Sequence, residues 1–305
     1  MPIFVKLHDD RKMIEKQLKL LIPKGRIYEN IKSLFVDAGF NIKLPDRTYR
    51  PDMGVDWLLA KIMKPQNVGE LLELGSHDAG FTGIDWILES GAEVVEILDL
   101  GLDKVSIIAA VPSNKVDQHR QIDKSKSIVV ATEYVHLAER YLKTNGYKYT
   151  IVRTYGATEV FPPDDADMII DNTASGQTLK DNGLVIVDTI LKSSTRFVAS
   201  NTAMNDPQKK ELIDRLAMLF KAVIEGREKV MLEMNVSKEK FDCLVAGAPA
   251  MRSPTVSPLY TSGKTEEGFA VKIAVKRNEV PDLIPRLKKL GASDIVEYNL
   301  RKVVY

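Results

Sequence analysis

Apolar runs alternate with amphipathic segments along this chain, and the alternation predicts strands and helices that follow one another. Leu18–Ile22 is a short apolar run typical of a buried strand, and Ile27–Phe35 carries apolar residues at helical spacing before Gly39. Val105–Val111 is apolar apart from Ser106, which suits a sheet covered on both faces. The pattern therefore predicts an α/β fold with a mostly parallel sheet.

The same pattern places further elements as far as Gly226. Strands are expected at 55–62, 78–82, 94–100, 105–111, 127–131 and 149–153. Helices are expected at 68–74, 84–91, 135–144 and from Pro207 to about Gly226. Another apolar run, Met168–Ile170, is typical of the end of a buried strand.

The chain beyond Gly226 has a different order of elements. The expected strands and helices are, in turn, a strand at 230–236, a helix at 238–244, strands at 255–259 and 269–275, a helix at 280–290 and a strand at 295–300. This is the βαββαβ order of a ferredoxin-like fold. We therefore expect a separate small domain.

Composition narrows the class of protein. The 305 residues suggest about two domains, and 44% apolar with 28% charged residues is typical of a soluble protein. A net charge of +1 gives no global field that would favour nucleic acid or a membrane. The single cysteine, Cys243, excludes an internal disulfide, and the four histidines show no ligand spacing. The N-terminus has no apolar signal-peptide core, so we expect a cytoplasmic protein.

The segment Asp171–Thr178 is the strongest candidate for chemistry. An acid, Asp171, follows the apolar strand, and a helix is expected to open near Thr178. Free amides at a helix N-terminus attract an anion, and Gly176 allows close approach of the backbone. Asp171 can accept hydrogen bonds from ribose, and hydroxyl donors are supplied by Thr173, Ser175 and Thr178. The pattern suits a phosphorylated sugar; a plain strand-to-helix turn is the alternative.

Other polar loops also follow predicted strands, where ligands bind in open α/β sheets. These loops are Pro23–Arg26, Lys64–Asn67, Thr82–Asp85 and Gly156–Glu159. Their cations could neutralise a pyrophosphate, although any one of them alone is more often a solvated surface residue. Their acids could equally cap the next helix.

Taken together, these stretches resemble the ATP phosphoribosyltransferase family in its long form. The resemblance covers Leu18 to Val304 and is carried by Ile22–Arg26, Asp78–Asp85, Ala131–Tyr134, Gly156–Glu159, Asp171–Leu184, Ser253–Leu259 and Leu287–Ala292. It implies a two-lobed catalytic region like that of periplasmic binding proteins, followed by a ferredoxin-like regulatory domain. The implied boundaries are 1–16 for an N-terminal extension, 17–105 with 190–225 for the first lobe, 106–189 for the second, and 227–305 for the regulatory domain.

The resemblance also implies an activity and a set of site residues. The family joins N1 of ATP to C1 of phosphoribosyl pyrophosphate and releases pyrophosphate with Mg2+, which is carried mainly by the substrate. The implied catalytic residues are Lys24, Arg26, Glu159 and Asp171. The implied binding residues are Lys64, Gly83, Asp85, Thr173, Ala174, Ser175, Gly176, Gln177 and Thr178. Lys64 and Lys104 stand where the family usually has arginine, which keeps the charge but loses the bidentate fork.

Regulation and assembly rest on the resemblance as well. Histidine would act as a feedback inhibitor at or beside Asn235, Ser253, Thr255 and Ser293, and dimers would assemble into hexamers. Turn and cap roles are the alternative for these four residues. Two other functions stay open: a catalytically silent small-molecule sensor on the same fold, or a phosphoribosyltransferase with a different acceptor base.

Overall fold

The computed structural model describes residues 17–305 except 46–47, 117–121, 250, 252 and 261–266, so the expected extension at 1–16 lies outside the described residues. The described chain divides into two compact units. The first runs up to Ser33 and resumes over Phe40–Ala217, and the second consists of Leu34–Gly39 and Met218–Tyr305. Among the described residues, no helix has the length and apolar character needed to cross a membrane.

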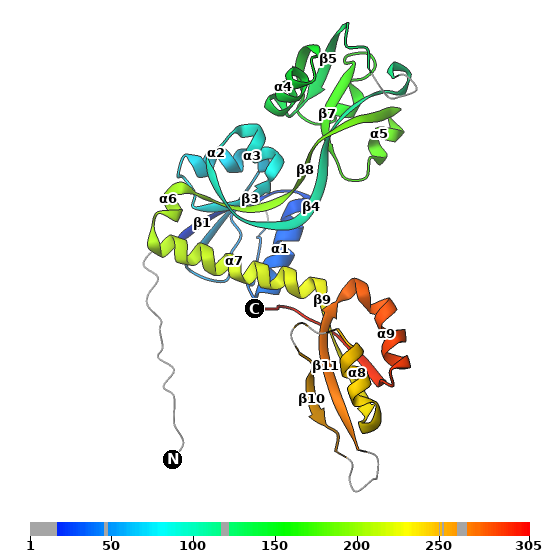
Figure 1. Ribbon diagram of the computed structural model, residues 1–305. Coiled ribbons are helices and arrows are strands. Elements are labelled where there is room, and N and C mark those ends of the chain that lie inside the picture. The colour runs from blue at the N-terminus through cyan, green and yellow to red at the C-terminus, as the bar shows by residue number, and fades with distance from the viewer. Residues whose placement is uncertain (1–16, 46–47, 117–121, 250, 252, 261–266) are drawn as a thin grey trace. The chain divides into compact units, whose positions relative to one another are not determined.

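The first unit contains one eight-stranded sheet with helices on its faces (Figure 1). Its first elements are β1 (Leu18–Pro23), α1 (Arg26–Ala38), β2 (Leu58–Met63), α2 (Val68–Glu73), β3 (Ala79–Gly83), α3 (Ile84–Ser90) and β4 (Val94–Pro112). Next come β5 (Ser127–Thr132), α4 (Val135–Thr144), β6 (Lys148–Arg153), β7 (Met168–Thr173) and α5 (Gln177–Asp181). The last are β8 (Leu184–Ser200), α6 (Asn201–Met204) and α7 (Pro207–Glu228), and both α1 and α7 contribute residues to the second unit as well.

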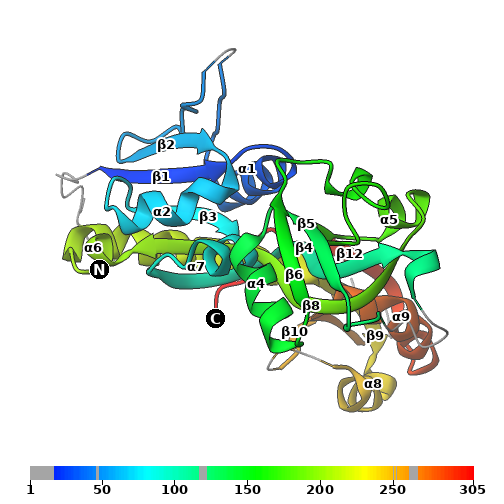
Figure 2. The same cartoon turned by 90° about the horizontal axis from the view of Figure 1, so that it is seen from above.

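The sheet joins two lobes through two long strands. The strand order is β2-β1-β3-β8-β4-β7-β5-β6. We call lobe I the part built on β1, β2 and β3, and lobe II the part built on β5, β6 and β7. Strands β4 and β8 run side by side from one lobe to the other (Figure 1 and Figure 2). The expected two-lobed, periplasmic-binding-protein-like α/β fold is confirmed.

Three details of the predicted sheet are wrong, and the first is that no strand was expected over Leu184–Ser200, where the structure has β8. The sheet is mixed rather than mostly parallel, because β8 pairs antiparallel with β3 and β4, and β4 pairs antiparallel with β7. The strands expected at 94–100 and 105–111 are one strand, β4. Its pairing register with β8 shifts around Gly101 and Asp103, whose φ values are 63° and 49°. These bulges interrupt the apolar alternation, so the pattern divides one strand into two.

The lobes have separate apolar cores. In lobe I, Leu21 of β1 packs with Val68 and Leu72 of α2 and with Val198 of β8. In lobe II, strands β4, β5 and β7 bury apolar residues against α4. Each core packs strand side chains against a helix on one face of the sheet. This packing fixes the positions of the strand ends, where the polar loops begin.

The second unit contains a four-stranded antiparallel sheet of order β10-β11-β9-β12. Its elements are β9 (Lys229–Ser237), α8 (Phe241–Gly247), β10 (Thr255–Pro258), β11 (Gly268–Lys276), α9 (Val280–Lys289) and β12 (Ser293–Asn299). Alternate residues of β9 point into a core shared with both helices. The predicted ferredoxin-like order is confirmed.

Candidate active site

The turn that follows β7 is held together by its own hydroxyl groups. Gly176 has a left-handed φ of 74°, and its amide donates to Oγ1 of Thr173 at 2.9 Å. The amide of Gln177 donates to Oγ of Ser175 at 3.4 Å, and its side chain donates to Asp181 at 2.7 Å. A hydroxyl that accepts from an amide still has its own proton to donate. The turn is therefore preformed, and Thr173 and Ser175 can still donate to an oxygen-rich ligand.

This turn lines a cavity of about 450 Å³. Several residues singled out from the sequence lie around it: Arg26, Glu159, Asp171, Thr173, Ala174, Ser175 and Thr178. Arg26 begins α1, Glu159 lies in the short 3-10 helix Thr158–Val160, and the others come from β7 and its turn. The fold thus gathers one cation, two carboxylates and a group of hydroxyls from three distant parts of the chain.

Asp171 is the acid with the most unusual environment in this cavity. Burial, together with the charges of Glu133 and Glu159, raises the pKa of its carboxyl to about 6. The amide of Asn172, 2.7 Å from Oδ1, and the hydroxyl of Thr158 oppose the rise. The groups that oppose the rise are therefore neutral donors, whereas two acids reinforce it.

A second cavity, of about 240 Å³, shares Arg26, Val105 and Asn172 with the first. It is also lined by Gly83 and Asp85 from the turn between β3 and α3. Asp85 is 3% exposed, so its charge needs hydrogen-bond donors. Ser193 of β8 donates to Oδ1 at 2.5 Å, and the hydroxyl of Tyr134 donates to Oδ2 at 2.9 Å.

Gly83 leaves the space that Asp85 occupies. A Cβ atom at position 83 would lie 2.0 Å from Oδ1 of Asp85 and 3.2 Å from Oγ of Ser193. Real Cβ atoms do not approach other atoms that closely, so any larger residue would displace the carboxylate. Glycine is needed at this turn for space, because its φ of −71° is ordinary for any residue.

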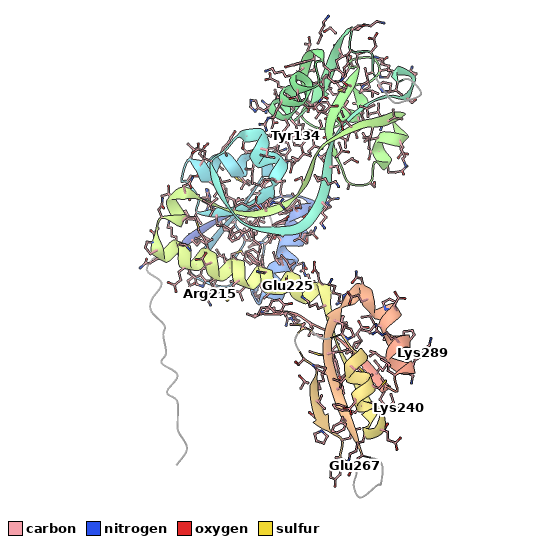
Figure 3. The ribbon with its side chains drawn as sticks, in the orientation of Figure 1. Tyr134, Arg215, Glu225, Lys240, Glu267 and Lys289 are labelled. Carbon is pink, nitrogen blue, oxygen red and sulfur yellow. The ribbon has the colours of Figure 1, made fainter. Side chains whose placement is uncertain are left out.

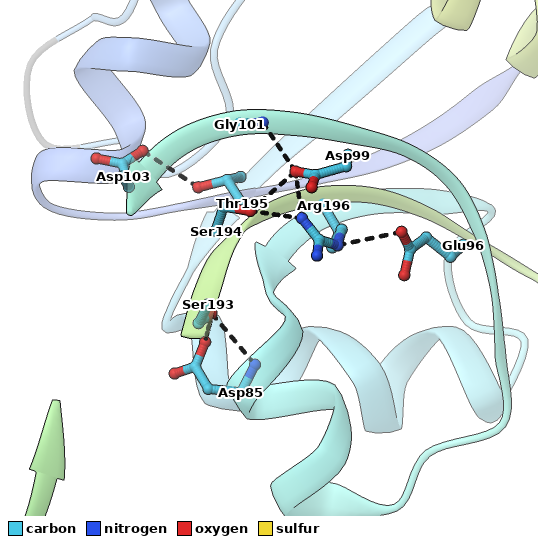
Figure 4. A network of polar contacts seen from close by, with 9 residues as sticks. All are labelled: Asp85, Glu96, Asp99, Gly101, Asp103, Ser193, Ser194, Thr195 and Arg196. Atoms are coloured by element: carbon cyan, nitrogen blue, oxygen red, sulfur yellow. Dashed lines mark hydrogen bonds and ion pairs between the residues drawn. The ribbon is translucent and has the colours of Figure 1, made fainter. Parts of the chain in front are cut away.

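The crossing of β4 and β8 carries a second polar network (Figure 4). Asp99 of β4 accepts from the amide of Gly101 at 2.8 Å and from Ser194 of β8 at 2.9 Å, and it pairs with Arg196. Asp103 accepts from Thr195 at 3.1 Å. These bonds tie the two strands at the bulges between the lobes.

Asp103 also holds the start of α1 in place. It accepts from the side chain of Asn30 at 2.7 Å and lies 3.4 Å from Nε of Arg26. The carboxyl is 4% exposed, whereas the Arg26 side chain is 64% exposed. Arg26 therefore keeps most of its surface free toward the two cavities that it lines.

Some candidate cations lie outside these cavities. Lys24 and Lys64 are exposed, and neither side chain lines the cavities described above, although Pro65 and Gln66 beside Lys64 line the second one. Lys104 lines a third cavity, of about 430 Å³, together with Lys192 and Arg196. The roles assigned to Lys24 and Lys64 stay predictions.

Sequence reasoning missed several residues of these cavities. Tyr134, Asn172 and Ser193 form hydrogen bonds there, but none was named as a site residue. Tyr134 lies where lobe II meets lobe I (Figure 3). Tyr134 could have been found from the sequence because it ends the stretch Ala131–Tyr134 that carries the family resemblance. Asn172 could have been found because it directly follows Asp171. Ser193 had no signal, because no strand was predicted over Leu184–Ser200.

The second unit brings two of the four candidate effector residues near one another. Asn235 of β9 donates to Asp294 at 3.1 Å, and Ser293 donates to the same carboxylate oxygen at 3.0 Å. Ser253 is exposed, and so is Thr255 of β10. Strand β11 separates β10 from β9, so Thr255 lies two strands away from Asn235. An effector role for these residues stays a prediction.

The fold and the cavities define a class of protein: a two-lobed α/β protein of the periplasmic-binding-protein type, with polar cavities beside the strands that join its lobes. The family model for ATP phosphoribosyltransferase matches residues 64–222, and the model for the HisG C-terminal domain matches residues 226–302. The chain belongs to the ATP phosphoribosyltransferase family, whose members are pentosyltransferases.

Individual relatives agree with this assignment. An ATP phosphoribosyltransferase of Pelodictyon phaeoclathratiforme is 39% identical over 95% of this chain and 99% of its own length. One from Thermodesulfovibrio yellowstonii is 37% identical over 96% of this chain and all of its own length. The ATP phosphoribosyl transferase (HisG:HisZ) complex of Thermotoga maritima contains a chain with the same fold, with a TM-score of 0.58 and 24% identity over 67% of this chain and 98% of that chain.

Proposed function

We propose that this protein transfers the phosphoribosyl group of phosphoribosyl pyrophosphate to N1 of ATP. The observation that carries the proposal is the single cavity lined by Arg26, Glu159, Asp171 and the hydroxyl-rich turn. A phosphoribosyl donor offers anionic phosphates to the cation and turn, and ribose hydroxyls to the carboxylates. The family assignment supplies the reaction that uses these groups.

The turn after β7 would hold the 5′-phosphate and the ribose. Its hydroxyls at Thr173 and Ser175 keep protons free to donate to phosphate oxygens. Asp171, at the start of the same turn, would accept from the ribose hydroxyls. Arg26 would face the pyrophosphate, because its guanidinium is exposed toward the same cavity.

The reaction would then proceed by displacement at C1 of the ribose. The bond from C1 to the pyrophosphate oxygen breaks, and the pyrophosphate leaves with the electron pair. The lone pair of adenine N1 forms the new bond to C1. Positive charge that develops on the sugar is stabilised by a carboxylate, for which Asp171 is the candidate, as in glycosyl transfer generally. Holding both substrates in one orientation supplies a large part of the rate increase.

Magnesium would enter as part of the substrate. Among the described residues, no group of three or more histidine, cysteine, aspartate or glutamate side chains could hold a metal ion. We therefore assign the ion to the pyrophosphate of the donor, whose oxygens are the ligands that Mg2+ prefers. The protein's own part is to place Arg26 beside that complex.

The decisive experiment mixes the purified protein with ATP, phosphoribosyl pyrophosphate and Mg2+. It follows the ultraviolet absorbance of the product, phosphoribosyl-ATP, which we call the adduct. We expect product that requires all three components. Binding of both substrates without product would instead support a silent sensor on this fold. Product formed only with another purine or pyrimidine would assign a different acceptor.

We further propose that the second unit binds histidine as an inhibitor near Asn235 and Ser293, and that copies of the chain assemble from dimers to hexamers. The proposal draws on the shared acceptor of these two residues, Asp294, which offers a carboxylate to an amino group. Asn235→Ala should weaken inhibition of the adduct assay by histidine and leave uninhibited turnover unchanged. Unaltered inhibition would place the effector elsewhere, and sedimentation velocity tests the assembly.

A further inference from the structure

Tyr134 connects lobe I to the turn that carries Asp171. Its hydroxyl donates to Oδ2 of Asp85 in lobe I at 2.9 Å, and it accepts from Nδ2 of Asn172 at 3.1 Å. The same Nδ2 group lies 3.3 Å from Oδ1 of Asp171. A continuous series of hydrogen bonds therefore runs from a carboxylate of lobe I to the carboxylate that is the candidate for catalysis.

A phenol suits position 134 because the side chain there donates one hydrogen bond and accepts another. Tyr134 is 1% exposed, and burial, followed by the charge of Asp85, raises the pKa of its hydroxyl. The group therefore keeps its proton, donates it to Asp85, and offers its lone pairs to Asn172. Phenylalanine would keep the shape of the ring and remove both bonds.

Lobe I fixes the position of Tyr134 through its ring as well. The Trp86 ring from α3 stacks on the Tyr134 ring, with centroids 4.4 Å apart and planes at 23°. Ser193 holds the other oxygen of Asp85, so the acceptor of the phenol has little freedom. Trp86 and Asp85 of lobe I therefore add to the lobe II residues, such as Leu137 and Met168, that pack around Tyr134.

A cap supplied from lobe I holds the helix that follows Tyr134. No side chain at the N-cap position of α4 caps its first turn. Glu89 of α3 accepts instead from the amides of His136 and Leu137, at 3.0 Å and 2.9 Å. A carboxylate at a helix N-terminus stabilises the helix. Glu89 of lobe I thus helps to place the start of α4, together with Thr132 of lobe II, whose hydroxyl accepts from the amide of Tyr134 at 2.9 Å.

We propose that Tyr134 is a positioning residue for Asp171: its hydroxyl, anchored on Asp85 of lobe I, holds the Asn172 amide that orients the Asp171 carboxylate. The proposal rests on the proposed function, because it gives Asp171 its role in the transfer. Separation of the lobes would break the bond between Tyr134 and Asp85 and would release Asn172. The orientation of Asp171 would then depend on the lobes being together.

The test compares Tyr134→Phe, Asn172→Ala and the double variant by kcat/KM for phosphoribosyl pyrophosphate in the adduct assay. Loss of these hydrogen bonds should lower kcat/KM about tenfold in each single variant. If Tyr134 acts through Asn172, the double variant loses no more than Asn172→Ala does. A structural role for Tyr134 would multiply the two losses to about a hundredfold, and that result would overturn the proposal, as would an unchanged Tyr134→Phe.

Tyr141→Phe is the matched control. Tyr141 is half-buried in α4, the helix that Tyr134 precedes, and its ring lies beside Tyr147 in lobe II. We expect its kcat/KM to stay within about twofold of the wild type. A tenfold loss in this control would show that the effect is not particular to the Tyr134 phenol and would overturn the specific role of Tyr134.

Failure of the proposed function gives a different result. If the wild type binds the donor but forms no adduct, the proposed transfer falls, and the same variants are compared by calorimetric dissociation constants for phosphoribosyl pyrophosphate. Equal losses in the three variants support the positioning role in binding, whereas multiplied losses or none overturn it. A wild type that binds no donor overturns both proposals.

Discussion

Two carboxylates of the first unit, Asp171 and Asp99, have pKa values that move in opposite directions. Asp171 is half-buried and the Asp99 side chain is 49% exposed, and burial alone raises the pKa of each. Burial prevails at Asp171, with support from Glu133 and Glu159, and its pKa is about 6. At Asp99, the Gly101 amide, the Ser194 hydroxyl and the Arg196 guanidinium outweigh burial and lower the pKa.

The difference separates a structural acid from an acid that is open to a ligand. Asp99 has protein donors and a protein cation, and its contacts tie β4 to β8. Asp171 has two carboxylates nearby, and its pKa rise is opposed by the neutral amide of Asn172 and the hydroxyl of Thr158. Perturbed acids that lack protein partners are typical of functional sites. A phosphoribosyl donor that carries hydroxyls and developing positive charge would supply the missing partner.

The largest expected effect is on turnover. Asp171→Ala should lower the rate of adduct formation by about a hundredfold or more, because the stabilisation of developing charge is lost. The free energy of unfolding should not fall, since the variant removes a carboxylate that burial disfavours. Asp164→Ala, an exposed acid of the same lobe, is the control and should turn over normally. Near-normal turnover of Asp171→Ala would remove Asp171 from the site.

The next effect is on the stability of the strand crossing. Asp103→Ala should lower the free energy of unfolding by about 2–3 kcal/mol, because Asn30 and Thr195 lose their acceptor and alanine tolerates the φ of 49° poorly. Urea unfolding measures the change. Asp103→Gly removes the same acceptor without the backbone strain and should lose about 1 kcal/mol less. A loss of less than about 0.5 kcal/mol in both variants would show that the crossing does not depend on Asp103.

The same two regions differ in how well the sequence predicts them. The end of β7 and the turn after it are contiguous, so an acid, hydroxyls and a glycine in one short stretch were enough to propose a phosphosugar site there. The crossing consists of residues far apart in the chain, such as Asp85 with Ser193 and Asp99 with Ser194. Pairings of this kind depend on strand register, which no local pattern contains.

Strand β8 shows why its pairing register could not be predicted from the sequence. Its first half mixes half-buried and exposed residues, and only the end near Phe197 is continuously buried. The alternation expected of a strand is therefore weak over Leu184–Leu191. Tyr134 presents the same difficulty, because an aromatic residue at the start of a helix is more often core than site. Its role follows only from the Asp85 carboxylate that the other lobe brings to its hydroxyl.

The smallest effect is a shift in pH dependence. The transfer requires Asp171 as the carboxylate, so kcat/KM should fall as the pH is lowered through about 6, the pKa of that group. The charge of Glu133 raises this pKa, so Glu133→Gln should move the acid limb to lower pH and keep the rate at neutral pH. Glu139→Gln, an acid on α4 that pairs with Lys143, should leave the limb in place. Asp99 is ionised throughout this range because its pKa is lowered. If Glu133→Gln leaves the acid limb of the pH profile in place, the limb comes from neither Asp171 nor Asp99.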